Sequence, residues 1–548
     1  MTQAIDTFYG EYLEKQPYPY QIEVWEKMEK MNFPLFINAP TGSGKTEAVI
    51  APFLEQFVSC NFYIAPRMIY VLPMRVLINS VANRIERYAK KISPNILVKV
   101  QHGDIPNSPF FMGDIVVTTL DQFLYGFARA SRQVGKHIDF PAGAIASSIV
   151  VFDEAHMYRD EFTFSIMRAL MEILHQSKIP FVVMTATMPQ SLEKSLFENI
   201  NLSDMQRISS NTPVNSRLKI IIENEPLYAN DKVKIPDRLL SRMTTEKTLI
   251  VANQVKRAQM VFDYIKSKLG LSENQIVLLH SRFTTADRKN NEKRAMSLLI
   301  YKENGKIKIP EGTGIVISTQ VLEAGIDFSA NLLITELAPA DSLIQRAGRC
   351  ARYPGESGEM VIFPVEDGDI KGYLPYKQDQ LEKALEWLKN NRNFNIKNFD
   401  EVCSFVNETL DYQANDYEAR DTLLDLYECV LYADNRPSNI QLREGKPIIL
   451  VVVDLSKGKG RSIADKIRDA IRAIDIRDNC INVDIGVGWK LLKDEILKFR
   501  LIFDENQGAW DFNKAKDKDI LPFSYYLLDS NNYDKHKGMI PDVACFII

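Results

Sequence analysis

Short apolar runs alternate with amphipathic segments along the first two thirds of the chain. In the first part, apolar runs predict buried β-strands at 33–37, 68–73, 114–119, 147–152 and 181–184. The segments between these runs carry helical patterns. Strands that alternate with helices predict an α/β fold with a mostly parallel sheet.

A second series of the same kind follows the polar stretch 209–217, which has the composition of a connection. Its strand and helix patterns lie at 247–265, 275–288, 312–328 and 332–352. The polar segment 366–378 then predicts a linker. The hydrophobic pattern therefore predicts two successive parallel-sheet domains.

The last third has a different pattern. Leu381, Ala384, Leu385 and Leu388 mark one amphipathic helix, and 411–433 predicts another. An apolar strand at 447–453 follows, and then a helix with isoleucines on one face: Ile463, Ile467, Ile471 and Ile474. These elements predict an accessory α/β domain.

Composition limits the class of protein. The 548 residues are 45% hydrophobic and 25% charged, as in ordinary globular proteins, and the length suits roughly three domains. No apolar run approaches the ~18 residues of a membrane helix, and the first residues lack an export signal. The six cysteines form no CxxC pair, which favours a reducing cytoplasm without a disulfide or zinc framework. The net charge of −4 neither indicates nor excludes nucleic-acid binding.

The strongest chemical signal is APTGSGKTEA, Ala39–Ala48, between a predicted strand and a predicted helix. In this context Thr41, Gly42, Ser43 and Gly44 form a loop whose backbone N–H groups converge on a phosphate. Lys45 is expected to bridge the β- and γ-phosphates of ATP, and Thr46 to hold Mg²⁺. The alternative is a glycine turn beside a lysine.

A glutamine upstream suits recognition of adenine. Gln21 lies between Tyr18 and Tyr20, and its amide can both donate to and accept from the adenine edge. The alternative is an exposed helix residue.

Two acids end the apolar run at 148–152. Burying Asp153 and Glu154 beside a strand is costly unless a cation is near. Asp153 is expected to hold Mg²⁺, and Glu154 to orient and deprotonate the attacking water. His156, Thr185 and Thr187 are the candidates for coupling this site to the rest of the protein.

The second series lacks a phosphate loop and carries Gln345, Arg349 and Arg352 instead. On a continuous helix these three side chains share one face, and the arginines could act as fingers on the γ-phosphate. The alternative is a solvated basic face. Gly325 and Asp327 are candidate nucleotide contacts on a loop.

These features predict two tandem RecA-like domains that bind ATP between them, with a C-terminal accessory domain. The expected boundaries are 1–210, 211–365, 366–435 (a helical linker region) and 436–548. If both domains grip one strand of nucleic acid, cycles of closure move the protein along it. The candidate strand contacts are Arg75, Thr119, Gln122, Asn253, His280, Arg282 and Thr319.

The motifs together resemble a superfamily 2 DExH helicase over about residues 1–365. The strings VVTTLDQFLYG, DEAHMY, LLHSRFTTADR, STQVLEAGID and ELAPADSLIQRAGRCAR more narrowly resemble the helicase of type I CRISPR interference. That resemblance implies a 3′-to-5′ translocase on single-stranded DNA, dependent on ATP and Mg²⁺, that works with a Cascade-type surveillance complex. The family usually carries a fused HD nuclease, but none of the six histidines here precedes an aspartate. A separate nuclease chain is therefore expected.

A basic cluster in the last third is a weaker candidate. Lys457, Lys459, Arg461 and Lys466 could hold a backbone phosphate or could be a solvated loop. Two other functions remain open from the residues: a general DNA or RNA helicase, and an ATP-gated nucleic-acid clamp.

Overall fold

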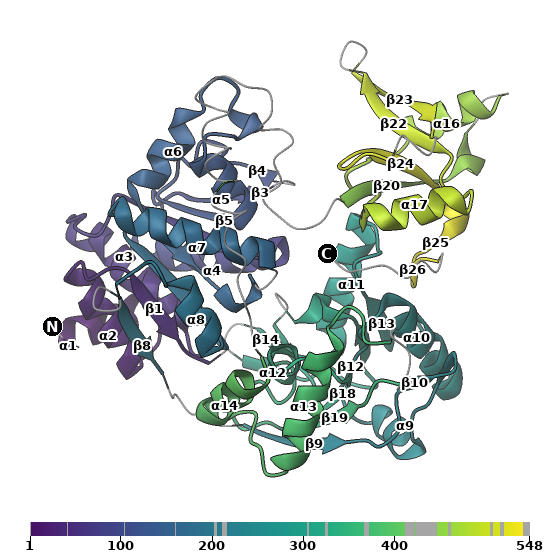
Figure 1. Ribbon diagram of the computed structural model, residues 1–548, viewed down its shortest axis with the longest axis horizontal. Coiled ribbons are helices and arrows are strands. Elements are labelled where there is room, and N and C mark those ends of the chain that lie inside the picture. Colours follow the sequence, from purple (N-terminus) through teal and green to yellow (C-terminus); the bar gives the residue numbers. More distant parts are fainter. Residues whose placement is uncertain are drawn as a thin grey trace. The chain divides into compact units, whose positions relative to one another are not determined.

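Figure 1 shows the elements of the computed structural model. The chain divides into two compact units. The first comprises Met1–Val214 with Lys397–Glu444, and the second Asn215–Ile396 with Gly445–Ile548. The residues that the structure describes are 2–40, 42–102, 105–158, 161–201, 205–210, 216–303, 306–323, 327–366, 372–410, 421, 447–458, 462–504, 508–515 and 520–540. The helix predicted at 411–433 thus falls almost entirely outside them.

An eight-stranded sheet forms the first unit, in the order β4-β3-β5-β2-β6-β7-β1-β8. All its pairings are parallel except the pairing of β4 with β3. The strands are β1 (Leu35–Asn38), β2 (Arg67–Leu72), β3 (Val98–His102), β4 (Ile105–Pro106), β5 (Ile115–Thr119), β6 (Ser148–Phe152), β7 (Phe181–Thr185) and β8 (Gln206–Ser209).

Helices cover both faces of this sheet because successive strand residues point to opposite sides. Leu35 and Ile37 belong to one apolar core, and Phe36 between them belongs to the other. The first core includes residues of α1 (Thr2–Phe8), η1 (Tyr9–Leu13), α2 (Pro19–Glu29), α3 (Lys45–Ser59) and α4 (Arg75–Ile92). The second includes residues of α5 (Leu120–Phe127), α6 (Asp139–Ala146), η3 (Ala155–Met157), α7 (Glu161–Gln176) and α8 (Gln190–Leu196). The short η2 (Arg132–Val134) and α14 (Phe399–Thr409) complete the helices described in this unit.

The second unit contains a six-stranded parallel sheet in the order β13-β16-β12-β18-β19-β9. Its strands are β9 (Arg217–Ile222), β12 (Thr248–Val251), β13 (Ile276–Leu279), β16 (Ile315–Ser318), β18 (Leu332–Glu336) and β19 (Ser357–Phe363). Its helices are α9 (Asp237–Met243), α10 (Val255–Leu269), α11 (Thr285–Leu298), η4 (Gln320–Leu322), α12 (Ala340–Ala347) and α13 (Gln378–Asn390). Short strands outside the sheet are β10 (Tyr228–Ala229), β11 (Lys232–Val233), β14 (Ile300–Glu303), β15 (Lys306–Lys308) and β17 (Phe328–Ser329).

A mixed five-stranded sheet, β21-β20-β24-β22-β23, forms the C-terminal part of the second unit. Its strands are β20 (Pro447–Val453), β21 (Cys480–Asp484), β22 (Phe499–Asp504), β23 (Ala509–Lys514) and β24 (Tyr525–Asp529). Around it lie η6 (Leu455–Lys457), α16 (Ile463–Arg472), α17 (Ile485–Lys493), η8 (Ser530–Asn532), β25 (Tyr533–Asp534) and β26 (Gly538–Met539). Two of the four predicted face residues, Ile467 and Ile471, are buried on α16, whereas Ile474 lies beyond the end of this helix. The side chain of Ile463 is outside the described part.

The predicted fold class is confirmed: two parallel α/β sheets are followed by a further α/β domain. In the first sheet, Asn38 pairs with Thr185, and Val71 pairs with Phe152. The carboxyl ends of β1, β2, β6 and β7 therefore meet at one edge, where an open parallel sheet presents its ligand contacts.

Candidate active site

The phosphate loop joins β1 to α3 at this edge. Gly42 and Gly44 have φ of 84° and 87°, a backbone conformation that other residues rarely adopt. A Cβ on Gly44 would also lie 2.6 Å from Nε2 of Gln21. Ser43 is buried, and its carbonyl accepts a hydrogen bond from the Tyr20 hydroxyl at 2.9 Å. Thr41 lies outside the described residues.

Lys45 opens α3 and points its ammonium back at the loop. Its Nζ donates to the carbonyls of Ala39 at 3.0 Å and Pro40 at 3.3 Å. An anionic oxygen is a stronger acceptor than a carbonyl, so a phosphate in the loop can take over these bonds.

The Gln21 side chain joins the start of α2 to the phosphate loop by hydrogen bonds. Its Oε1 accepts from the backbone N–H of Tyr18 at 2.8 Å, and its Nε2 donates to the carbonyl of Gly44 at 2.8 Å. The rings of Tyr18 and Tyr20 stack beside it, 6.4 Å apart. Reading adenine would require Gln21 to exchange these partners, and that role stays a prediction.

Asp153 follows β6 and is buried. Its Oδ1 accepts from the backbone N–H of Glu154 at 2.8 Å, and its Oδ2 from the Tyr70 hydroxyl at 2.6 Å. Burial raises the pKa of Asp153, and Glu154 raises it further while Lys45 lowers it. A bound cation would favour the ionised carboxylate.

Thr46 is joined to Asp153 by Tyr70. The Thr46 and Tyr70 hydroxyls are 3.2 Å apart, and Arg84 of α4 donates to Thr46 Oγ1 at 2.6 Å. A hydroxyl and a carboxylate in one hydrogen-bonded group are oxygen ligands of the kind that Mg²⁺ takes. These residues therefore fit the predicted magnesium site.

Tyr70 and Arg84 were not among the predicted site residues. Tyr70 lies in an apolar strand, and Arg84 lies in an amphipathic helix. A buried hydroxyl or guanidinium needs polar partners. A polar group within an otherwise apolar pattern was therefore the signal that could have identified these two residues.

The acid loop contacts the end of β7. Nδ1 of His156 lies 3.1 Å from the Thr185 hydroxyl, which also accepts from the backbone N–H of Thr187 at 3.3 Å. Glu154 has φ of 52°, a strained conformation that only surrounding contacts maintain. The structure thus brings the predicted coupling residues together, and their coupling role stays a prediction.

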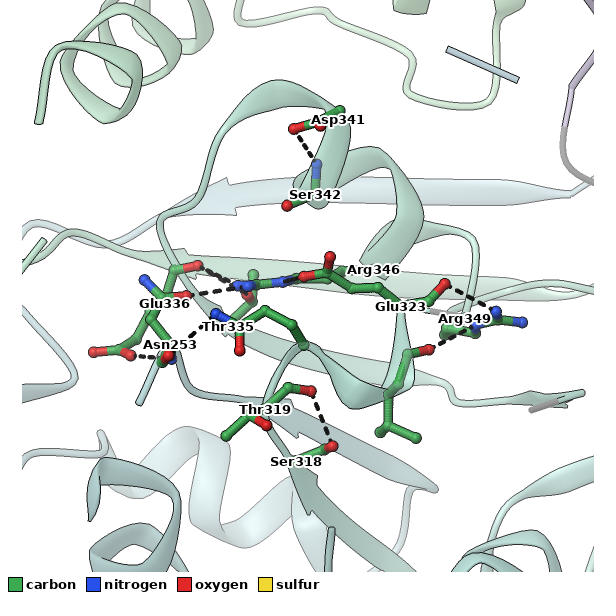
Figure 2. Close-up of polar contacts among 12 residues, drawn as sticks. Asn253, Ser318, Thr319, Glu323, Thr335, Glu336, Asp341, Ser342, Arg346 and Arg349 are labelled. Carbon is green, nitrogen blue, oxygen red and sulfur yellow. Dashed lines mark hydrogen bonds and ion pairs between the residues drawn. The ribbon is translucent and has the colours of Figure 1, made fainter. Parts of the chain in front are cut away.

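In the second unit, the expectation that Gln345, Arg349 and Arg352 share one helical face is wrong. Helix α12 ends at Ala347, with Gly348 as its C-cap. Beyond it the chain turns, and Ala351 has φ of 45°. Arg349 donates instead to the carbonyls of Leu322 and Glu323, each at 3.1 Å (Figure 2).

Arg352 lies near the same loop. Its Nε donates to Oδ1 of Asp327 at 2.8 Å, and Asp327 is exposed. Gly325 is outside the described residues, and Gln345 is half-buried in α12. The finger role of the two arginines and the nucleotide contacts of this loop stay predictions.

The centre of this cluster is Arg346, which was also not predicted. It is 1% exposed, and Figure 2 shows its guanidinium among Asn253, Glu323 and Thr335. Its guanidinium donates to five acceptors. They are Thr335 Oγ1 at 2.8 Å, Glu323 Oε1 at 2.9 Å, Tyr376 OH at 2.9 Å, Glu336 O at 3.1 Å and Asn253 Oδ1 at 3.1 Å. Arg346 therefore joins the ends of β12 and β18 to the η4 loop.

Most of the candidate strand contacts are held by the protein itself. Asn253 is fully buried, and its Nδ2 donates to the carbonyl of Leu337 at 2.8 Å. Gln122 accepts at 3.1 Å from the amide of the buried Gln101. Thr119 and Thr319 are buried at the ends of β5 and β16. Arg75 begins α4, and its side chain is outside the described part.

His280 and Arg282 contact residues at and next to β26. Nε2 of His280 lies 2.9 Å from the carbonyl of Lys537, and its Nδ1 accepts from the backbone N–H of Arg282 at 3.1 Å. Met539 in turn donates to the carbonyl of Arg282 at 3.0 Å. Burial lowers the pKa of His280 to about 3. Any strand contact from this imidazole requires Lys537 to move away.

The basic cluster of the last third is only partly described. Lys457 lies 3.5 Å from Asp454, and Lys466 is exposed. Lys459 and Arg461 are outside the described residues.

Two family models match the chain. One, described as DEAD/DEAH box helicase, matches residues 18–195, and the other, described as CRISPR-associated nuclease/helicase Cas3, C-terminal, matches residues 244–355. A CRISPR-associated helicase Cas3 of Thermoproteus tenax is 29% identical in an alignment of 388 residues that covers 67% of this chain and 62% of that protein. The chain is therefore similar to Cas3-like helicases of superfamily 2 over these two regions. These matches agree with the predicted enzyme class, an ATP-hydrolysing helicase.

Solved structures agree at the level of the fold. T. fusca Cas3 with ADP gives a TM-score of 0.67 at 19% identity, over 98% of this Cas3-like chain and 70% of that chain. A chain of a CRISPR RNA-guided surveillance complex, described as pre-nicking, gives 0.62 at 19% identity over 96% and 70%. The chain spans 62%, 52% and 45% of the length of three curated Cas3 relatives. Among the described residues, no helix is long and apolar enough to cross a membrane, and no group of three or more His, Cys, Asp or Glu could hold a metal.

Proposed function

We propose that this Cas3-like chain is an ATP- and Mg²⁺-dependent translocase that moves 3′ to 5′ on single-stranded DNA in type I CRISPR interference. The observation that carries the proposal is the group formed by Lys45, Thr46 and Asp153 at one edge of the first sheet. It joins an ammonium beside the phosphate loop to oxygen ligands for a cation, which is what phosphoryl transfer needs.

Each residue has a defined part in hydrolysis. Lys45 exchanges its two carbonyl partners for phosphate oxygens. Thr46 and Asp153 hold Mg²⁺, which when bound neutralises charge on the phosphates. Glu154 orients the attacking water and accepts its proton.

Two arginines of the second unit have a proposed role in the reaction. Arg349 and Arg352 are the candidate fingers for the transition state. The Arg346 cluster is linked to Arg349 through Glu323, whose Oε1 accepts from Arg346 and whose backbone carbonyl accepts from Arg349. Coupled movement of His156 and Thr185 would transmit a change at the nucleotide from the acid loop to the end of β7.

The proposed partners are a Cascade-type surveillance complex and an HD nuclease on another chain. The surveillance-complex structure supports the first, because one of its chains shares this fold. The second rests on the histidines, none of which precedes an aspartate. A general DNA or RNA helicase is the main alternative, and an ATP-gated clamp is the second.

ATP turnover measured with and without single-stranded DNA or RNA tests the proposal. We expect single-stranded DNA to stimulate turnover more than RNA does, and Lys45→Ala to abolish it. Stimulation by RNA alone would favour the general helicase, and normal turnover by Lys45→Ala would overturn the site assignment. A streptavidin-displacement assay on 3′- and 5′-labelled DNA tests polarity and separates a translocase from a clamp. Nicking of single-stranded DNA by the pure chain would overturn the separate-nuclease proposal.

A further inference from the structure

Four side chains from four elements form a hydrogen-bonded line behind the phosphate loop. Arg84 donates to Thr46 Oγ1 at 2.6 Å, Thr46 lies 3.2 Å from the Tyr70 hydroxyl, and Tyr70 donates to Asp153 at 2.6 Å. Arg84 comes from α4, Thr46 from α3 and Tyr70 from β2, while Asp153 follows β6. One guanidinium on α4 thus donates to the candidate metal ligand Thr46 on α3.

The direction of this line is fixed at both ends. A guanidinium can only donate, and an ionised carboxylate can only accept. Since the single Tyr70 proton goes to Asp153, the proton between the two hydroxyls must belong to Thr46. Thr46 Oγ1 accepts from Arg84 and donates to Tyr70, so one of its two lone pairs remains for a cation.

Arg84 is held in place by its other surroundings. Glu47, next to Thr46, is 2% exposed and accepts from Lys15 at 2.8 Å and from Tyr88 at 2.9 Å. Burial by itself would raise the pKa of Glu47, but Arg84 and Lys15 lower it to about 2. Arg84 and Tyr88 are four residues apart on α4, so one face of this helix contacts both Thr46 and Glu47. The Nε of Arg84 is buried and has no hydrogen-bond partner among the described residues.

We infer that Arg84 is a positioning residue for Mg²⁺, acting through Thr46. It orients the Thr46 hydroxyl so that its free lone pair points to the cation, with Tyr70 completing the orientation. The inference rests on the proposed function, because it assigns Thr46 to the metal. It concerns the affinity for the Mg²⁺–nucleotide complex and does not concern nucleotide binding alone.

The test measures binding of a fluorescent ADP to the full chain, in EDTA and across a Mg²⁺ titration. We expect Arg84→Gln and Tyr70→Phe to raise the Mg²⁺ concentration for half-maximal effect about tenfold, while affinity in EDTA stays within about twofold of wild type. Arg84→Lys keeps the positive charge beside Glu47 but loses the planar fork, so it should fold and show a smaller rise of the same kind. Arg87→Gln is the matched control, because Arg87 is an exposed guanidinium on the same helix.

Two results would overturn the inference. One is an unchanged Mg²⁺ requirement in Arg84→Lys and Tyr70→Phe. The other is an equal loss of affinity with and without Mg²⁺, which would mean that Arg84 only supports the loop. The proposed function fails in a different way: wild-type protein would then bind ADP without any effect of Mg²⁺, or would not bind it.

Discussion

The polar residues at the strand ends of the two parallel sheets have different kinds of partners. At the first sheet, Lys45 donates to two backbone carbonyls, and Thr46 Oγ1 accepts from Arg84. At the second sheet, Arg346 is closed in by five acceptors of the protein itself. In the proposed function, the first edge exchanges these partners for a ligand. The second edge uses its polar side chains to connect segments of the protein itself.

The same two sheets also share a detail. Thr118 of β5 donates to the carbonyl of Gln101 at 2.8 Å, and Ser318 of β16 donates to the carbonyl of Leu279 at 2.9 Å. Each hydroxyl also reaches the carbonyl of the following threonine, Thr119 or Thr319. Both predicted strand contacts thus end a strand that is tied to its neighbour in the same way. The two sheets thus share these hydroxyl contacts, and they differ in the polar residues that follow their strands, such as Lys45 and Arg346.

The largest effect should come from opening the closed cluster. Arg346→Met leaves Glu323 and Asn253 without their cation, so we expect a loss of about 3–5 kcal/mol in the free energy of unfolding of the second unit. Urea unfolding followed by hydrogen exchange of β18 peptides measures it. Arg352→Met is the control, with an expected loss below about 1 kcal/mol because its ion pair with Asp327 is partly exposed. An equal loss in the two variants would mean that the cluster has no special rigidity.

A smaller effect is expected behind the phosphate loop. The folded pKa of Glu47 is about 2, below the ordinary 4.5, so the stability it contributes is present above pH 4.5 and is lost as the pH falls toward 2. Glu47→Gln should therefore cost about 3 kcal/mol at pH 7, and less as the pH drops through this window. Urea unfolding at several pH values checks this, with Glu86→Gln on α4 as the control, because the ion pair of Glu86 with Lys90 is partly exposed. A pH-independent difference would contradict the electrostatic explanation.

His280 offers a pH-dependent test in the second unit. Its folded pKa of about 3 is depressed below the ordinary 6.5, so the unfolded state binds the proton more readily and stability falls as the pH drops below 6.5. Between pH 7.5 and 5.5 this amounts to about 1.4 kcal/mol. We expect hydrogen-exchange protection of β13 peptides to fall accordingly in wild type and not in His280→Gln. His536→Gln, at a more exposed histidine, should behave as wild type.

The smallest effect is expected at the basic loop of the last third. Lys457 is exposed, so its replacement should change stability by less than about 0.5 kcal/mol. If the loop contacts phosphates, replacing Lys457, Lys459 and Arg461 with alanine should weaken DNA binding and flatten its salt dependence. Binding measured across salt concentrations decides this, and an unchanged slope would identify a solvated loop.

Sequence alone determined the parts of the protein that depend on neighbouring residues. The strand, the glycines and the helix start around Lys45 lie within one short stretch, so local chemistry fixed the phosphate loop. The acids after β6 were equally readable, because a buried strand ending in Asp153 needs a cation. The two-sheet fold followed from the alternation of apolar runs.

The tertiary structure decided what depends on residues far apart in the chain. Gly348 ends α12 before Arg349, whose guanidinium then bonds to carbonyls more than 25 residues earlier. Arg346 is buried because Asn253, 93 positions away, and the end of β18 bring their acceptors to it. His280 is covered by Lys537, which lies 257 positions further along the chain. A polar side chain can be buried only where the fold brings hydrogen-bond partners to it. These partners lie far away in the chain, so a local sequence pattern does not identify them.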